Sequence, residues 1–138
     1  MSREDMDVDA AKAIFDDHND VFGWQPRGAF ARSHANGQLI ICAAGCEVLG
    51  FCRFYDRRDG IRKIYDMAVA RAHLRKGIGA RMLAAAGAAA PRDRLAIELK
   101  CPEGAAANFF YEAMGFVSLA AEAGKRKRLS VWRRDLRG

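Results

Sequence analysis

The sequence lacks several features that would indicate a membrane or secreted protein. No apolar run approaches the ~20 residues that a membrane-spanning helix needs. The chain opens Met-Ser-Arg-Glu-Asp-Met-Asp, without the apolar core of a signal peptide behind a basic start. We therefore expect no membrane partner and a cytoplasmic location.

Metal and disulfide patterns are also missing. The chain has 4 cysteines, none in a Cys-x-x-Cys pair and none with a histidine at ligand spacing. Cys42 and Cys52 lie in apolar, strand-like runs, where a free thiol behaves as a small hydrophobic group. The sequence predicts reduced, structural cysteines and no metal site.

The chain shows no internal repeat and no Pro- or Ser-rich linker. Its 138 residues, 51% hydrophobic and 29% charged, are enough to bury a core without metal or disulfide support. We expect a single domain over residues 1–138.

Charge is unevenly distributed. The net charge is +6, but residues 1–20 carry seven acids against two bases, and residues 121–138 carry seven bases against two acids. Such asymmetry can steer an anionic cofactor to one end and a cationic amine or basic peptide to the other. The alternative is two solvated surfaces without a partner.

The first half of the chain combines helical and strand-like patterns. Apolar residues at helical spacing predict an amphipathic helix over 7–18 with Asp7 as its N-cap, and a short helix is expected over 28–34. Turn signals at Asn36-Gly37 and Arg58-Asp59-Gly60 separate expected strands. Those strands cover 39–44, 48–55 and 62–69.

The second half alternates helices with strands. An alanine-rich run predicts a helix over 76–90, which Pro91 ends. Alternating apolar residues predict a strand over 95–101, and a helix over 104–114 follows, with Gly115 as its left-handed stop. Two last strands are expected over 116–121 and 128–134. This order predicts an α/β domain with a mixed sheet.

A glycine-rich turn follows the third expected strand. Leu74–Ala80 (LRKGIGA) opens a helix, and helix N-termini present unpaired N–H groups that bind phosphates. Gly77 and Gly79 let a diphosphate approach the backbone, while Arg75 and Lys76 add positive charge. The turn is neither a P-loop nor a Rossmann fingerprint. Close packing of helix on strand is the alternative.

A second informative stretch is Ala107–Phe116 (ANFFYEAMGF), on the next expected helix. Phe109, Phe110 and Phe116 are expected in the core. Tyr111 fits either the core or a site that flanks the same cleft in the sheet.

Together the two stretches resemble the GNAT N-acetyltransferase superfamily. Val69–Gly79 (VARAHLRKGIG) is similar to its acyl-CoA motif, and Ala107–Phe116 to its later helix-and-strand motif. The resemblance covers about residues 38–120. It implies a mixed, mostly antiparallel sheet of about six strands flanked by helices, with the family's first strand missing. It also implies that the strands over 62–69 and 95–101 splay apart.

The resemblance further implies the cofactor and its contacts. The cofactor is acetyl-CoA, and the backbone of Met67–Val69 would pair with its pantetheine arm like an added strand. The sequence departs from the family at Leu74, where Gln or Arg is usual, and at Gly104, where many members have Asn. The implied cofactor-binding residues are Met67, Ala68, Val69, Leu74, Arg75, Lys76, Gly77, Ile78, Gly79, Ala80, Asn108 and Tyr111.

The implied reaction is direct attack of a primary amine on the thioester. Tyr111, with a phenol pKa of about 10, would protonate the departing thiolate. A distorted strand near Met67–Val69 would offer a backbone N–H to the oxyanion. Asp66 is the predicted general base, with Glu98 as a second candidate, and a solvated or ion-paired carboxylate is the alternative for both.

Other functions stay open from the sequence. Lys125–Arg128 and Arg133-Arg134 around Trp132 form a basic, partly aromatic patch, which suggests a nucleic-acid-binding module or an acetyltransferase acting on an RNA-linked amine. An inactive CoA-binding regulator is a third reading. The acceptor amine is not readable from the sequence, and a homodimer stays open as an alternative to a monomer.

Overall fold

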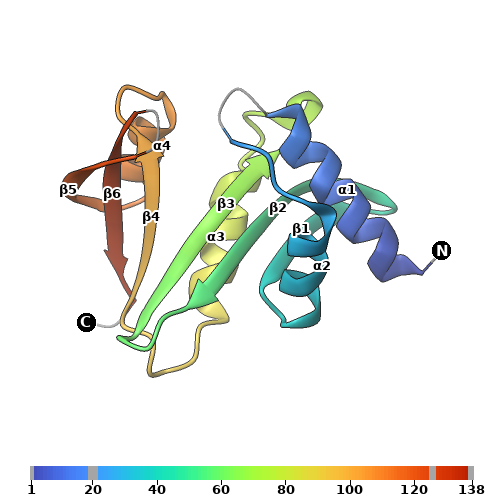
Figure 1. Ribbon diagram of the computed structural model, residues 1–138, viewed down its shortest axis with the longest axis horizontal. Helices are drawn as coiled ribbons and strands as arrows, with labels where there is room; N and C mark the ends of the chain where they lie inside the picture. The colour runs from blue at the N-terminus through green and yellow to red at the C-terminus, as the bar shows by residue number, and fades with distance from the viewer. Residues whose placement is uncertain (1, 19–21, 125–126, 137–138) are drawn as a thin grey trace. The chain divides into compact units, whose positions relative to one another are not determined.

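The computed structural model describes residues 2–18, 22–124 and 127–136. Lys125 and Arg126 of the predicted basic patch lie outside the described residues, as do Asp20 and Arg137. The described chain contains, in order, α1 (Arg3–Asp17), α2 (Arg27–Ala35), β1 (Leu39–Ala44), β2 (Glu47–Asp56), β3 (Ile61–Val69), the 3-10 helix η1 (Arg71–His73), α3 (Ile78–Ala88), β4 (Ala96–Pro102), α4 (Ala107–Ala113), β5 (Val117–Ala123) and β6 (Arg128–Asp135) (Figure 1).

The strands form one mixed sheet in the order β1-β2-β3-β4-β6-β5. β3 and β4 pair in parallel, because α3 carries the chain across between them, whereas β1–β2, β4–β6 and β5–β6 pair antiparallel. The predicted fold class, a mixed and mostly antiparallel sheet of about six strands flanked by helices, is confirmed. Among the described residues, no helix combines the length and apolar character that crossing a bilayer requires.

The helix boundaries differ from prediction where capping decides them. α1 begins at Arg3 rather than residue 7, because the Ser2 hydroxyl accepts a hydrogen bond from the Asp5 N–H at 3.0 Å. The predicted cap Asp7 instead lies inside the helix, 3.7 Å from the Arg3 guanidinium. The predicted helix over 104–114 begins only at Ala107, since Gly104 has a φ of +83°.

The chain divides into two compact units. Unit 1 contains the chain up to Phe54 together with Tyr65–Ala89, and unit 2 contains Tyr55–Ile64 and the chain from Ala90 onward. Helices cover both faces of the strands in unit 1. Phe51 of β2 packs in one core cluster with Phe15 of α1 and Phe30 of α2. Its neighbour Gly50 faces Ile78 and Met82 of α3, since successive strand residues point to opposite faces.

Unit 2 has one apolar and one charged face. Ile97, Leu99 and Trp132 are buried on the first, as the alternation in the sequence predicts. Glu98 lies on the other face, opposite Lys63 in β3 and Arg133 in β6. The prediction of one acetyltransferase domain over residues 1–138 stays a prediction.

Candidate active site

The predicted phosphate cradle lies in unit 1, between η1 and α3. Gly77 is the N-cap of α3, has a φ of +78° and makes no side-chain cap hydrogen bond. The first helical bond runs from the Arg81 N–H to the Gly77 carbonyl at 3.1 Å. The N–H groups of Ile78, Gly79 and Ala80 therefore have no helical partner, and the helix dipole places partial positive charge beside them.

The surroundings of Gly77 fit a diphosphate. A Cβ built on Gly77 would meet nothing within 4 Å, so the space before the helix is open. Any side chain at this position would project into that space. Arg75 and Lys76 are exposed beside it, and Leu74 is 47% exposed with only its backbone to offer an anion. These residues would hold the diphosphate through backbone N–H groups and two cationic side chains.

His73, beside the cradle, is engaged on both ring nitrogens. Its Nδ1 lies 3.1 Å from Lys76 Nζ, and its Nε2 lies 3.1 Å from Glu47 Oε1. The ring thus links a cradle cation to the start of β2. The ring therefore positions Lys76 and has no ring nitrogen left for the cofactor.

The end of β3 is bonded to β2 through one of its two edges, and on the other edge the Val69 carbonyl contacts His18. The Ala70 N–H donates to the Leu49 carbonyl of β2 at 2.8 Å. Because strand residues alternate, Ala68 directs its backbone groups the same way, whereas Met67 and Val69 direct theirs to the opposite edge. The predicted pairing of Met67–Val69 with a pantetheine arm would use this second edge, and it stays a prediction.

The number of residues differs between β2 and β3 over the stretch that joins them. β3 is linked to β2 at Ala70–Leu49 and again at the hairpin, where the Arg57 N–H donates to the Ile61 carbonyl at 2.9 Å. Between these two bonds β3 has one residue more than β2, so one of its residues is unpaired in a bulge. These two bonds do not fix its position within 62–69, and the distortion predicted near Met67–Val69 stays a prediction.

His18 is a site residue that sequence reasoning missed. Its Nε2 lies 2.9 Å from the carbonyl oxygen of Val69. A carbonyl only accepts, so Nε2 carries the proton, and the second lone pair of that oxygen can accept another donor. Arg71 also contacts the end of α1. Its Nη2 donates to the Asp17 carbonyl at 2.8 Å, and its Nε lies 3.0 Å from Asp17 Oδ2. No sequence spacing indicates a contact across 51 residues.

Asp66, the predicted general base, is held in a buried ion pair of unit 1. Arg53 Nε donates to Asp66 Oδ1 at 3.1 Å, and Nη2 donates to Oδ2 at 2.7 Å. The guanidinium also lies 4.9 Å from the Phe30 ring centre and 4.8 Å from that of Tyr65. Burial raises the pKa of Asp66, and the Arg53 hydrogen bonds oppose that rise. Both oxygens are occupied, which favours a structural role, and base catalysis stays a prediction.

Tyr111 and Asn108 lie on α4 in unit 2. The half-buried Tyr111 ring packs edge to face on Phe110 and Phe116, with centroid distances of 5.3 and 5.9 Å. Asn108 donates to the carbonyls of Pro102 and Ala105 and accepts from Trp132 Nε1 at 2.8 Å. Its amide therefore ties α4 to β4 and β6, and a contact with the cofactor stays a prediction.

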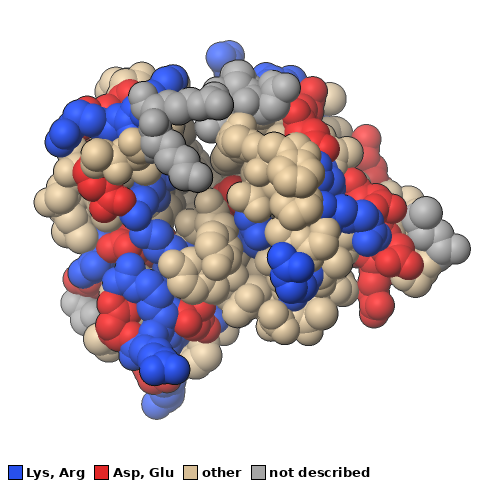
Figure 2. Space-filling view, viewed as in Figure 1, with Lys and Arg blue, Asp and Glu red and all other residues tan. Residues whose placement is uncertain are grey.

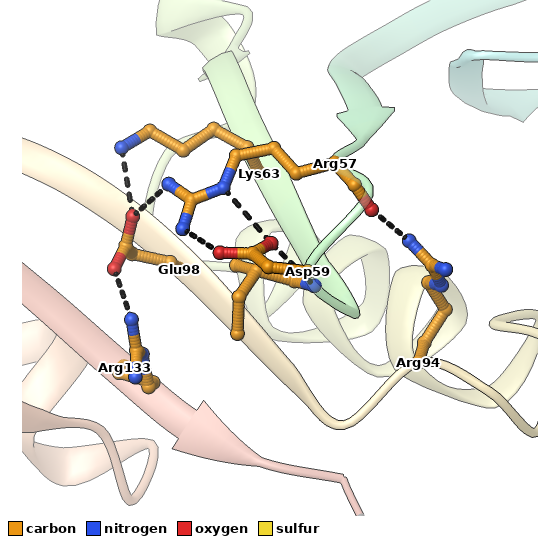
Figure 3. A network of polar contacts seen from close by, with 7 residues as sticks. Arg57, Asp59, Lys63, Arg94, Glu98 and Arg133 are labelled. Carbon is orange, nitrogen blue, oxygen red and sulfur yellow. Dashed lines mark hydrogen bonds and ion pairs between the residues drawn. The ribbon is translucent and has the colours of Figure 1, made fainter.

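Glu98, the second base candidate, is surrounded by cations in unit 2 (Figure 3). Lys63 and Arg57 donate to its Oε2 at 2.9 and 3.0 Å, and Arg133 donates to its Oε1 at 2.8 Å. Burial acts to raise the pKa of Glu98, but the hydrogen bonds from Lys63 and Arg133 outweigh it and the pKa is lowered. A carboxylate held this firmly in its ionised form is a poor proton acceptor.

The predicted basic patch differs from expectation in its aromatic residue. Trp132 is only 7% exposed, and its indole N–H donates to Asn108 Oδ1. The ring is therefore not accessible for stacking on a nucleic-acid base. Arg133 pairs with Glu98, whereas Arg134 is exposed. The predicted nucleic-acid-binding patch therefore lacks the accessible aromatic ring that the sequence suggested.

Within each unit the structure brings different parts of the site together. The cradle, the end of β3, His18 and Asp66 belong to unit 1, and Tyr111, Asn108 and Glu98 belong to unit 2. An uncapped helix N-terminus next to the end of β3 is the arrangement that the predicted acyl-CoA site needs, and phosphate binding there stays a prediction.

Comparison with known protein families leads to the same class of enzyme. The model of the acetyltransferase (GNAT) domain family matches residues 35–118. The chain belongs to the GNAT acetyltransferase family. Membership confirms the predicted enzyme class, an acyltransferase, and acetyl-CoA as its cofactor. No curated protein sequence matches the chain.

Solved structures share the fold at low identity. The yncA protein of Salmonella typhimurium, solved with its cofactor acetyl-CoA, is 16% identical with a TM-score of 0.80, covering 100% of this chain and 92% of its own. The ribosomal-protein-S18-alanine N-acetyltransferase of Escherichia coli is 15% identical with a TM-score of 0.74, covering 94% and 88%. An aminoglycoside 6′-N-acetyltransferase complexed with coenzyme A is 11% identical with a TM-score of 0.78, covering 98% and 91%.

Proposed function

We propose that this protein transfers the acetyl group of acetyl-CoA to a primary amine, with Tyr111 as the proton donor. The observation that carries the proposal is the open N-terminus of α3 at Gly77, which has no side-chain cap, close in sequence to the end of β3 at Met67–Val69. Both features suit the diphosphate and the pantetheine arm of one ligand.

Each part of the chain has a defined task in this reaction. Bound acetyl-CoA supplies a thioester carbonyl that a neutral amine can attack directly. The backbone of Met67–Val69 aligns the arm, and an N–H of this irregular strand stabilises developing negative charge on oxygen. Tyr111 holds a proton on its phenol oxygen until charge develops on the sulfur.

The structural relatives do not identify the acceptor. One is named for an alanine of a ribosomal protein and another for an aminoglycoside. The same fold therefore serves acceptors of very different size. The direct test is thiol release from acetyl-CoA across amino acids, polyamines, aminoglycosides and peptides. Release that rises with one amine supports the proposal, and none above buffer with any amine contradicts it.

Replacement of Tyr111 by Phe tests the proton donor. The variant keeps the ring that packs on Phe110 and Phe116 and removes only the hydroxyl. We expect kcat to fall by about 100-fold or more, with acetyl-CoA affinity nearly unchanged. The matched control is Tyr55→Phe in β2. Wild-type kcat in the Tyr111 variant would remove Tyr111 from the mechanism.

A further inference from the structure

The outer edge of β1, in unit 1, has no neighbouring strand. β1 ends the strand order of the sheet, and among the described residues only the helices α1 and α2 precede it. Both faces of β1 are covered, since Leu39 and Ile41 pack against the core cluster under α1 and α2, and α3 packs on the other face. What is left is the row of backbone groups along the outer edge.

Alternate residues supply these backbone groups. The Phe54 N–H donates to the Gln38 carbonyl at 3.0 Å, so the backbone of Gln38 points toward β2. Because strand residues alternate, Leu39, Ile41 and Ala43 direct their N–H and carbonyl groups away from β2. No described residue forms a backbone hydrogen bond with these outward groups.

The outer edge of β1 is regular, although the pairing of β1 with β2 shifts register. Cys42 lies opposite Gly50, and the next residue of β1 lies opposite Val48. Leu49 of β2 is therefore the extra residue, and β1 keeps its alternation from end to end.

β1 also lacks the features that keep most edge strands from pairing. Its sequence, LIICAA, contains no charged residue and no proline, two common protections of a sheet edge. A regular, uncharged edge of this kind is a template for another strand.

A second copy of β1 fits this edge in one antiparallel register. A two-fold axis at Ile41 places Ile41 opposite Ile41 of the second copy, and Leu39 opposite Ala43. The outward residues of one strand then face those of the other, and each such pair exchanges two N–H···O bonds. Like charges do not meet along the strands, because β1 has none.

The end of β1 at Gly45 is acidic on the face that α1 covers. Arg3, the first residue of α1, donates to the Gly45 carbonyl at 3.5 Å, so the first turn of α1 lies at this end. That turn carries Glu4 and Asp5, and Figure 2 shows acidic side chains gathered over α1. Glu4 is exposed and makes no ion pair with the described residues.

The opposite end of β1 is basic. The Gln38 N–H, just before β1, donates to the Ser33 carbonyl of α2 at 2.7 Å, so the last turn of α2 lies there. That turn carries Arg32 and His34, and Arg32 is exposed, with no ion pair to any described residue. α1 and α2 share one core cluster, so both charged ends lie on one face of the sheet. Antiparallel pairing would bring the acidic end of each copy beside the basic end of the other.

We propose that this protein forms a two-fold symmetric dimer through antiparallel pairing of β1 with β1 of a second copy, in which Glu4 of each copy faces Arg32 of the other. Strands of 6 residues cover only part of the ~800 Å² that each partner gives to a standard interface, so the ends of α1 and α2 complete it. This dimer is independent of the proposed enzymatic function.

The mass of the protein in solution tests the dimer directly. In sedimentation velocity over about 1–100 µM protein, we expect a concentration-dependent shift from monomer to dimer. A monomer over this whole range would overturn the proposal.

Ala43→Pro tests which edge is used. Proline removes the outward N–H of Ala43 without the loss of a bond to β2, and edge strands tolerate it. We expect the dimer Kd to rise by about 10-fold or more, because the symmetric interface loses the bond twice, while the circular dichroism spectrum stays that of wild type.

Ala123→Pro in β5, the other edge strand, is the matched control. The Gly124 N–H donates to the Lys127 carbonyl at 2.9 Å, so the preceding Ala123 points away from β6 and also has an outward N–H. This variant should keep the wild-type Kd. Loss of the dimer in Ala123→Pro, or an unchanged dimer in a folded Ala43→Pro, would overturn the proposal.

Charge reversal tests the register without altering the strand. Glu4→Arg and Arg32→Glu should each raise the dimer Kd by about 10-fold or more, since each reversal acts at two symmetry-related places. The double variant should return to within about 3-fold of wild type, because opposite charges face each other again. Glu112→Arg on α4, at an exposed position of unit 2, is the control and should leave the Kd unchanged. A double variant that dimerises more weakly than either single variant would overturn the proposed pairing.

Discussion

Single backbone positions decide how the cradle can work. Gly77 combines a φ of +78° with open space where a Cβ would stand. An L side chain in this conformation costs about 1–2 kcal/mol and would also project into the predicted diphosphate position. Stability and binding should therefore both respond to this residue.

Gly77→Ala tests the two effects against a matched control. We expect a loss of about 1–2 kcal/mol in the free energy of unfolding and a Kd for CoA raised by about 10-fold or more, measured by urea titration and calorimetry. Gly37→Ala is the control, because Gly37 has a φ of +69° and also meets nothing within 4 Å. Gly37→Ala should lose the same free energy of unfolding as Gly77→Ala, while its Kd for CoA stays at the wild-type value. Equal Kd values for the two variants would contradict a phosphate site at Gly77.

Elements hold the site together through contacts at their ends. The last residues of α1 reach β3 and η1 by His18–Val69 and Asp17–Arg71. The Val69 carbonyl belongs to the edge of β3 that is predicted to receive the pantetheine arm. His18, at the end of α1, donates to the oxygen of this carbonyl. α1 is thereby coupled to the cofactor-binding strand.

His18→Ala should loosen this coupling. We expect a loss of about 1 kcal/mol in stability and faster amide hydrogen exchange in the last turn of α1 and in Met67–Val69. His34→Ala is the control, since His34 lies in the last turn of α2 and belongs to the same residue type. Unchanged exchange at the end of β3 in His18→Ala would show that the hydrogen bond contributes nothing to the strand.

At the scale of the whole molecule, charge is organised in local pairs more than in two opposite ends. Acidic side chains gather over α1 in Figure 2, but Arg27 already reaches two of them, Asp5 and Asp9. Among the described residues, Arg53–Asp66 in unit 1 and Lys63–Glu98 in unit 2 are pairs with both side chains largely buried. Stability should therefore depend on pH through these buried groups.

Glu98 makes this pH dependence testable. Its folded pKa lies below its unfolded value of about 4.3, so its stabilisation is complete above that value and is lost as the pH falls through the lower, folded pKa. Glu98→Gln should cost roughly 3 kcal/mol at pH 7, since it removes the carboxylate that pairs with Lys63 and Arg133, while Arg57 keeps Asp59. The difference from wild type should shrink toward acidic pH, measured by urea unfolding from about pH 7 to about pH 3.

Glu122→Gln is the control for this series. Glu122 pairs with Lys100 at the surface, and its side chain is 45% exposed. Its replacement should cost less than about 1 kcal/mol at any pH, because solvent screens the pair. A Glu98 variant no less stable than this control would show that the cation cluster holds together without its carboxylate.

The sequence by itself determined the elements, their order and the family. The periodicity of hydrophobic residues, the alanine content and the turn glycines are local signals, so they placed the strands and α3 to within a few residues. The two glycines Gly77 and Gly79 after a strand indicated the predicted cradle. The tertiary structure alone decided the partners. Arg53 meets Asp66, three cations meet Glu98, and His18 meets Val69 across 51 residues. These contacts depend on strand register and helix packing, which join residues whose chemistry gives no local sign of the pairing.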